Sequence, residues 1–153
     1  MSTRASGSFK EANVAYLFPS AEWVAQLQTV VNKDEAYAAS AKTWEGDFYF
    51  VVEPGPGVRE PVKFYLDLWH GKCREAHIVT GKEAKQPEFV ISGTIETYRK
   101  VFQKQLDPIQ ALMTRRLKVQ GNMMKIMRSV KATLDLVNCC SLIDTTYPDT
   151  IKA

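Results

Sequence analysis

Residues 62–69 alternate strictly between two kinds of side chain, and this pattern constrains the fold more than any other feature of the sequence. The first set is apolar and the second is mostly polar or amphipathic: Val62, Phe64, Leu66 and Leu68 against Lys63, Tyr65, Asp67 and Trp69. Because successive strand residues point to opposite faces, a period of two predicts a β-strand with one apolar face. A shift of one residue would move the apolar set to the wrong face, so the pairing register is tightly constrained.

Other stretches of the chain show strand patterns separated by turn signals. Phe48, Phe50 and Val52 share one face in residues 44–54, and the "PGPG" of residues 54–57 must break the chain. Residues 73–80 form the returning strand of a hairpin, and 88–93 and 115–121 form a fourth and a fifth strand.

Helical spacing flanks these strands, and each predicted helix has a recognisable start. The predicted helices cover residues 21–34, 35–44, 95–105, 108–113 and 123–143, the last being the longest. Their predicted N-caps are Ser20, Asp34, Thr94, Asp107 and Asn122. Pro108 at the first helical position strengthens the start after Asp107.

Grouped strands with helices around them predict an α+β fold with a mainly antiparallel sheet. The last strand follows a helical crossover, so we expect it to be the one that pairs parallel to a neighbour. With 153 residues the chain is expected to form one domain. We place that domain at residues 20–145, between a flexible tail of residues 1–19 and a short tail of residues 146–153.

His70, Cys73 and His77 form the one arrangement that resembles a metal site. A two-residue turn would pair His70 with Cys73 and put His77 on the same face. A three-residue turn would pair Leu66 with Ala76, matching apolar with apolar, and would move His70 into the turn. The apolar pattern favours the longer turn, and a fourth ligand is missing, so a small metal-dependent enzyme is the weakest of the functions considered.

Asp67 interrupts an otherwise apolar strand, and it has two interpretations. It could be a buried acid with a raised pKa, or it could lie on the solvated face beside Lys63, opposite Glu75 or Ala76. The second is the more common situation for such a residue. We find no nucleophile elbow, phosphate loop, dinucleotide fingerprint or zinc-protease motif.

Positive charge is concentrated in one part of the chain. Residues 108–134 contain no Asp or Glu but carry Arg115, Arg116, Lys118, Lys125, Arg128 and Lys131. This segment has a charge of +6, so with a net charge of +3 the rest of the chain carries about −3. The more common interpretation is a solvated helix face; the alternative is an anionic partner such as a phospholipid surface. Nucleic acid is disfavoured because no aromatic residue interleaves with these charges.

The three cysteines do not form a disulfide framework, because their number is odd and Cys139 and Cys140 are adjacent. This predicts a reducing compartment. The N-terminal residues contain no apolar core of a secretory signal, and no run of 18 apolar residues is present. The C-terminal residues do not match a peroxisomal signal. We therefore expect a cytoplasmic protein.

Four of the five methionines, Met113, Met123, Met124 and Met127, lie close together in the sequence. Methionine is flexible and polarizable, so it fills irregular cores and also lines surfaces that accept varied ligands. Core filling is the more common explanation for such a cluster, and the methionines alone leave both explanations open.

The stretches "LDLWHGKC", "FVISG" and "QKQLDPIQALMTRRLKVQGNMMKIM" resemble, in this order, the sterol carrier protein family of non-specific lipid-transfer proteins. The matching positions include Asp67, Gly71, the run Leu106–Pro108 and the run Gly121–Met123. The resemblance covers roughly residues 21–144. "TWEG" and "DLWHG" look more like the compact prokaryotic branch, in which an acyl chain is a better expected ligand than a sterol.

This resemblance implies a five-stranded sheet with helices over one face and an apolar tunnel between them. It implies binding of fatty acid, fatty acyl-CoA, phospholipid or sterol, without catalysis, and we expect the first three to be the lipids that are bound and transferred. No cofactor is expected. The expected partners are these lipids and, transiently, an anionic membrane attracted by Lys118, Lys125 and Arg128, but not nucleic acid. The protein is expected to be a monomer or a weak homodimer.

The tunnel is expected to lie between the strands and the later helices, with the methionine face of the long helix as a movable wall. The expected ligand-binding residues are Phe48, Phe50, Leu66, Leu68, Ile91, Phe102, Leu106, Ile109, Met113, Val119, Met123, Met124, Met127, Val130 and Leu134. The main alternative is an interaction or accessory domain with a solid core.

Overall fold

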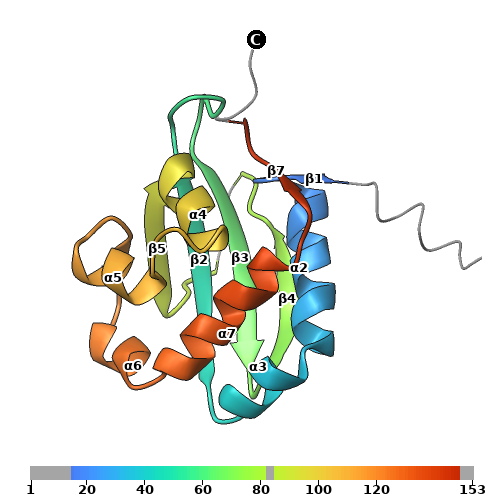
Figure 1. The fold of residues 1–153 in the computed structure, drawn as a ribbon, viewed down its shortest axis with the longest axis vertical. Helices are drawn as coiled ribbons and strands as arrows, with labels where there is room; N and C mark the ends of the chain where they lie inside the picture. The colour runs from blue at the N-terminus through green and yellow to red at the C-terminus, as the bar shows by residue number, and fades with distance from the viewer. Residues whose placement is uncertain (1–14, 82–84, 149–153) are drawn as a thin grey trace, which may run out of the picture.

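The computed structural model of the protein describes residues 15–81 and 85–148, in which helices lie against one face of a β-sheet (Figure 1). The strands are β1 (Tyr16–Leu17), β2 (Glu45–Glu53), β3 (Val62–Trp69), β4 (Lys72–Ile78), β5 (Phe89–Thr94), β6 (Lys118–Gln120) and β7 (Thr145–Thr146). The helices are α2 (Ala21–Lys33), α3 (Glu35–Ser40), α4 (Ile95–Phe102), α5 (Pro108–Met113), α6 (Met123–Met127) and α7 (Val130–Ser141). None of the helices in these ranges is long and apolar enough to cross a bilayer.

The main sheet has five strands in the order β4-β3-β2-β5-β6, which confirms the predicted α+β fold. The parallel pair is β2–β5, whereas the last strand, β6, pairs antiparallel with β5, so the predicted location of the parallel pairing was wrong. The reason is that the crossover lies earlier in the chain. After β4 the next strand, β5, lies on the other side of β2 and runs in the same direction as β2.

The β3–β4 hairpin follows the register favoured by the apolar pattern up to Asp67, and then departs from both registers considered. Leu66 pairs with Ala76 and Phe64 with Ile78, as the apolar pattern predicted. A bulge after Asp67 then shifts the pairing, so that Trp69 faces Lys72 across a two-residue turn of His70 and Gly71. The bulge absorbs the extra residue that the sequence pattern had assigned to a longer turn.

All five predicted N-caps are confirmed. The side chains of Ser20, Asp34, Thr94, Asp107 and Asn122 each accept a hydrogen bond from a backbone N–H in the first turn of the helix that follows. Such caps satisfy N–H groups that the helix itself leaves unpaired.

The predicted single helix over residues 123–143 is instead two helices, α6 and α7, separated at Arg128 and Ser129. Arg128 ends α6, and Ser129 precedes α7 without making a side-chain capping bond. The two helices consequently do not share one continuous apolar stripe. α7 packs against α2, α3, α4 and α5 and forms the centre of the helical layer.

The chain is ordered beyond both predicted domain boundaries. β1 pairs in parallel with β7, and Phe18, next to β1, is completely buried between Trp23, Phe102 and Tyr147. The predicted tails, residues 1–19 and 146–153, were therefore too long. Each includes a residue, Phe18 or Tyr147, whose side chain is buried in the core. Residues 1–14 and 149–153 lie outside the described residues.

The face of the sheet away from the helices carries polar and aromatic side chains. Tyr65 donates a hydrogen bond to Asp47 (2.7 Å), and Tyr49 donates one to the carbonyl oxygen of Lys85 (2.9 Å). Asp67 lies on this face opposite Glu75, as predicted, and it binds Arg74 through two N–H···O contacts of 3.0 and 3.2 Å. Asp67 therefore acts in an ion pair at the sheet surface.

Candidate functional site

An apolar cavity of about 100 Å³ lies between the inner face of the sheet and the helical layer. The sheet side of its wall comes from alternate residues of three strands: Phe48, Phe50, Phe64, Leu66, Leu68 and Ile91. These residues are neighbours because β2 pairs with both β3 and β5 in register. The period-two pattern of the sequence thus builds one continuous wall.

Each of the helices α2 to α7 contributes to the opposite wall. α7 supplies five residues at helical spacing: Ala132, Thr133, Leu136, Val137 and Cys140. The others come from α2 to α6 and the segments beside them: Trp23, Leu27, Tyr37, Trp44, Tyr98, Val101, Phe102, Pro108, Leu112, Leu117, Ile126 and Ser129. Figure 1 shows α7 crossing over the sheet between α4 and α2.

The polar atoms of three large aromatic residues in the wall are bonded to the protein itself. Trp23 Nε1 donates to Thr145 Oγ1 (3.0 Å), and Trp44 Nε1 donates to the Gly46 carbonyl oxygen (3.1 Å). The Tyr98 hydroxyl lies 3.0 and 3.1 Å from the carbonyl oxygens of Ile91 and Val51, which share its proton. These groups offer no free donor to a ligand, so the cavity interior is suited to hydrocarbon.

Tyr37 differs from the other aromatic residues of the wall. It is only 2% exposed, and within the described residues its hydroxyl has no hydrogen-bond partner. Burial raises the pKa of this phenol, and the nearby thiols of Cys73 and Cys139 raise it further. The hydroxyl is therefore protonated at neutral pH and is the one aromatic polar group of the wall left unbonded within the described ranges.

The cysteines are buried and free. Burial raises the pKa of Cys73 and of Cys139 to about 12, and burial raises that of Cys140 as well. Since the thiolate is the reactive form, none of these thiols is set up as a nucleophile at neutral pH.

His70, Cys73 and His77 do not converge. His70 Nε2 lies 2.6 Å from Glu45 Oε2, and Cys73 faces the core opposite Leu68. His77 lies opposite Tyr65 on the other face of the sheet, with its Nε2 2.8 Å from Glu75 Oε2. In the parts of the chain that the structure describes, no group of three His, Cys, Asp or Glu side chains is placed to hold a metal ion.

The structure divides the fifteen predicted binding residues into three groups. Phe48, Phe50, Leu66, Leu68, Ile91 and Phe102 line the cavity. A second group packs against the core away from the cavity wall: Leu106, Ile109, Val119, Met123 and Met127. The third group is exposed: Met113, Met124, Val130 and Leu134.

The prediction that methionines form the cavity wall was wrong. Met113 is 69% exposed and Met124 is 59% exposed, while their sequence neighbours Leu112 and Ile126 line the cavity. Met113 is the last residue of α5 and faces away from Leu112. The methionine face of the predicted long helix ends at Ser129, because a stripe along one continuous helix does not carry over to two separate helices.

Several wall residues escaped the sequence analysis, although patterns pointed to some of them. Phe64 belongs to the same alternating set as Leu66, and Trp23 and Leu27 are four residues apart on one helix. For Tyr37, Trp44 and Ser129, no local pattern distinguished a cavity position from an ordinary core position.

The fold and part of the sequence match known proteins. The model of the SCP-2 sterol transfer family matches residues 24–134. A crystal structure of sterol carrier protein 2 superposes with a TM-score of 0.73 at 31% identity, covering 81% of this chain and 97% of that chain.

A second solved structure is similar over most of its length. It is the solution structure of a conserved hypothetical protein from Thermus thermophilus, described as possibly a sterol carrier protein. Its TM-score is 0.74 at 31% identity, with 83% of this chain and 90% of that chain covered. The apo form of sterol carrier protein 2 from Yarrowia lipolytica, at 16% identity and a TM-score of 0.53, shares the fold over 78% of this chain and 89% of that chain. No curated protein matches the chain.

Proposed function

The chain belongs to the SCP-2 sterol transfer family, whose members bind and transfer lipids, and we propose that it carries a single-chain or two-chain acyl lipid in its apolar cavity. The ligand classes are fatty acid, fatty acyl-CoA and phospholipid. The observation that carries this proposal is an apolar cavity whose large aromatic wall residues, Tyr37 apart, use their polar atoms within the protein.

Hydrocarbon burial supplies enough free energy for such binding. Removing one methylene from water contributes about 0.8 kcal/mol, so a chain of about 16 carbons contributes about 12 kcal/mol before the costs of association. Because this term does not depend on the ligand's polar group, the proposed site accepts lipids of several classes. No bond is made or broken in the ligand.

The cavity must enlarge to hold a whole acyl chain. Its volume of about 100 Å³ is below the roughly 150 Å³ that accommodates benzene in an engineered protein cavity. The helical wall is the part that can move, since the strands of the opposite wall are held by a continuous hydrogen-bond ladder. α6 and α7 are separate helices with an uncapped junction at Ser129, which makes this part of the wall the natural place to open.

A cavity-filling variant tests the proposal. Ala132 lies on α7 in the cavity wall, so Ala132→Phe would occupy the space with a ring. We expect titration with a fluorescent fatty acid to show a loss in affinity of at least about tenfold, because the displaced ligand carbons lose their burial. Ala25→Phe, at an exposed position on α2, is the matched control and should bind as the wild type does.

Folding of the variant has to be established separately, since overpacking costs about 1–3 kcal/mol. Circular dichroism and urea unfolding check this, and Leu136→Trp on the same helix face provides a second filling substitution. Unchanged fatty-acid affinity in two folded, filled variants would rule out the cavity as the binding site. Native mass spectrometry of the purified wild type adds an independent readout, because a solid-core interaction domain would carry no lipid mass.

A further inference from the structure

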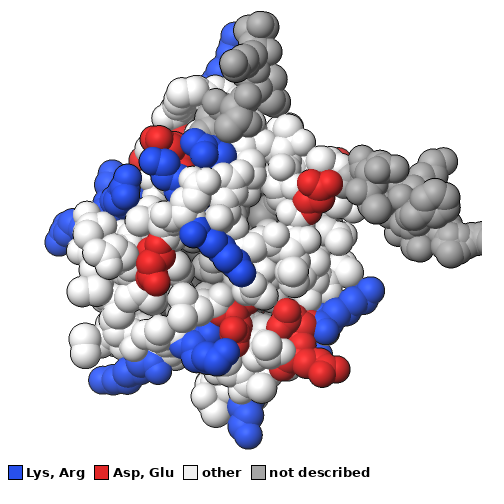
Figure 2. Space-filling view, viewed as in Figure 1, with Lys and Arg blue, Asp and Glu red and all other residues white. Residues whose placement is uncertain are grey.

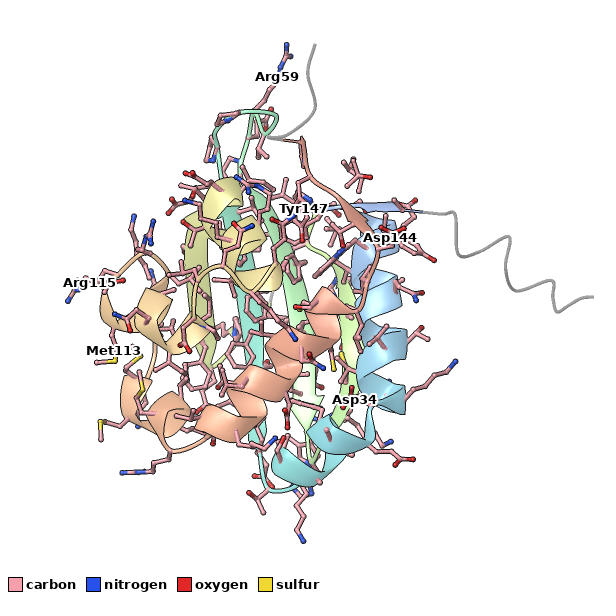
Figure 3. All side chains as sticks on the ribbon, in the orientation of Figure 1. Asp34, Arg59, Met113, Arg115, Asp144 and Tyr147 are labelled. Carbon is pink, nitrogen blue, oxygen red and sulfur yellow. The ribbon has the colours of Figure 1, made fainter. Side chains whose placement is uncertain are left out.

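Residues 108–134, which contain no Asp or Glu, include an exposed edge of the molecule that carries both apolar and basic side chains. We call this edge the α5–α6 tip and define it by Met113, Arg115, Arg116, Met124 and Arg128. All five are exposed, and Figure 3 shows Met113 and Arg115 pointing away from the body of the protein. Two long apolar side chains in water thus lie on the same short segments as three exposed arginines.

The three arginines of the tip differ from the lysines of the same segment. Lys118, Lys125 and Lys131 are paired with Glu53, Glu88 and Asp135. Within the described residues, Arg115, Arg116 and Arg128 have no carboxylate partner. Asp107, the nearest acidic residue before the segment, accepts hydrogen bonds from the backbone of α5. The tip therefore keeps an uncompensated positive charge.

The chemistry of the tip suits a phospholipid surface better than other partners. Arginine binds phosphate with two parallel N–H···O bonds, and an unbranched methionine can enter the acyl region without a shaped pocket. A nucleic-acid partner would call for aromatic side chains on which bases stack, and the tip has none. In Figure 2, basic side chains lie above and below the region of α5 and α6, with uncharged surface and an acidic group between them.

We propose that the α5–α6 tip docks onto an anionic phospholipid bilayer and that docking opens the neighbouring cavity. The second part rests on the proposed function; the first does not. Each element of the tip also contributes to the cavity wall: Leu112 precedes Met113, Leu117 follows Arg116, and Ile126 lies on α6 with Met124. When the outward residues enter the bilayer, the inward residues of the same short helices move with them.

The uncapped junction between α6 and α7 permits this movement. Ser129 lies in the cavity wall and its side chain makes no capping bond, so α6 can tilt without breaking a side-chain cap on α7. Docking thus couples contact with the donor or acceptor membrane to access to the cavity. Of the three residues predicted from sequence to attract the membrane, Lys118 and Lys125 are paired with acidic residues, whereas Arg128 belongs to the tip.

Co-sedimentation with vesicles tests the docking. Wild-type protein should pellet with vesicles of equal parts phosphatidylcholine and phosphatidylglycerol, and not with phosphatidylcholine alone. The pair Arg115→Gln and Arg116→Gln should weaken binding by about thirtyfold. The pair Lys42→Gln and Arg59→Gln removes the same charge from exposed positions elsewhere and should leave binding unchanged.

The apolar contribution is tested at constant charge. Met113→Ser with Met124→Ser should reduce sedimentation, whereas Leu142→Ser, at a position 62% exposed outside the tip, should not. Binding of wild type to neither vesicle, or equal binding of the arginine pair and wild type to anionic vesicles, would overturn the docking proposal.

Transfer of a fluorescent fatty acid to the same vesicles tests the opening. The transfer rate should rise with the concentration of anionic vesicles, and the double methionine variant should lose this rise while keeping its affinity for the fatty acid in solution. Ala132→Phe separates the two proposals, because it should lose fatty-acid binding but sediment as the wild type does. A transfer rate independent of vesicle concentration, with docking intact, would contradict opening at the membrane.

Discussion

Tyr37 places a phenol hydroxyl in the protein interior without a bonding partner among the described residues. A buried donor left unbonded costs about 1–3 kcal/mol, so natural cores contain few of them. Its position in the wall of the cavity gives the group one place to find a partner, namely a polar atom of a bound ligand. At the scale of single residues, the Tyr37 hydroxyl is therefore a buried donor that a ligand in the cavity could bind.

Replacing Tyr37 by Phe should stabilise the ligand-free protein. We expect the free energy of unfolding to rise by about 1 kcal/mol, because the substitution removes the unbonded hydroxyl and leaves the ring in place. Urea unfolding of delipidated protein measures this. Tyr98→Phe is the matched control: its hydroxyl is bonded to Ile91 and Val51, so its removal should destabilise. Loss of stability in Tyr37→Phe would mean that the hydroxyl is hydrogen-bonded in solution.

The residue scale also shows what sequence can and cannot predict. The five N-caps were predictable because a cap depends on a few consecutive residues. The outward direction of Met113 and Met124 was not, because it depends on where neighbouring helices end and how they pack. The clustering of methionines in the sequence did not show whether their side chains face the cavity or the solvent.

At the scale of elements, the turns that begin and end helices carry much of the specificity of this fold. Gly121 precedes the cap of α6 with a φ of +128°, a conformation that other residues rarely adopt. A Cβ at this position would lie 2.7 Å from a ring carbon of Phe89 and 2.8 Å from the carbonyl oxygen of Glu88. The turn between β6 and α6 thus requires glycine both for its backbone and for its contact with β5.

Gly121→Ala should lower the free energy of unfolding by more than about 2 kcal/mol, since it combines strain with overpacking. Gly55→Ala is the control, because nothing lies within 4 Å of the added carbon and its φ is not positive. Thermal and urea unfolding of both variants provide the comparison. Equal stability of the two would show that the β6–α6 turn can relax without cost.

The helix starts allow a second comparison at this scale. Asp107 accepts hydrogen bonds from the N–H groups of Ile109 (2.8 Å) and Gln110 (3.1 Å), so Asp107→Ala should cost about 1 kcal/mol. Ser129 makes no such bond, and Ser129→Ala should cost much less. A large cost for Ser129→Ala in urea unfolding would contradict an uncapped junction between α6 and α7.

The hairpin shows how far element patterns lead. Apolar pairing predicted the register of Phe64 and Leu66 because a slip would expose the whole apolar face. It did not predict the bulge after Asp67, because a bulge satisfies the same apolar pairing with a shorter turn.

At the scale of the whole molecule, the buried titratable groups predict how stability depends on pH. Cys73 and Cys139 have pKa values raised by burial from 9.0 to about 12. Their protonated forms are favoured in the folded state, so this contribution is fully present below about pH 9 and is lost between about pH 9 and pH 12.

We expect the free energy of unfolding to fall above about pH 9 by about 1.4 kcal/mol per pH unit for each such thiol. Urea unfolding across the alkaline range measures the slope. Cys73→Ala should have a shallower slope than the wild type, because it removes one of the groups. A slope unaffected by this substitution would mean that the Cys73 thiol ionises equally in the folded and unfolded states.

The order of strands and helices was enough to predict the α+β class, and three motifs at residues 66–73, 89–93 and 103–127 carried the family resemblance. The parallel β2–β5 pair and the β1–β7 pair were not predicted. Both join segments far apart in sequence, and β1 and β7 are only two residues long, too short to show a period.

The pairing of β1 with β7 has a consequence for how the protein is made. Phe18 is surrounded by Trp23, Phe102 and Tyr147, so its burial site is complete only after the last of these residues has left the ribosome. The sheet strands and their hairpin are available much earlier. We therefore expect a nascent chain that stops just before residue 144 to keep Phe18 accessible to chaperones, and synthesis of residues 144–147 to allow its burial.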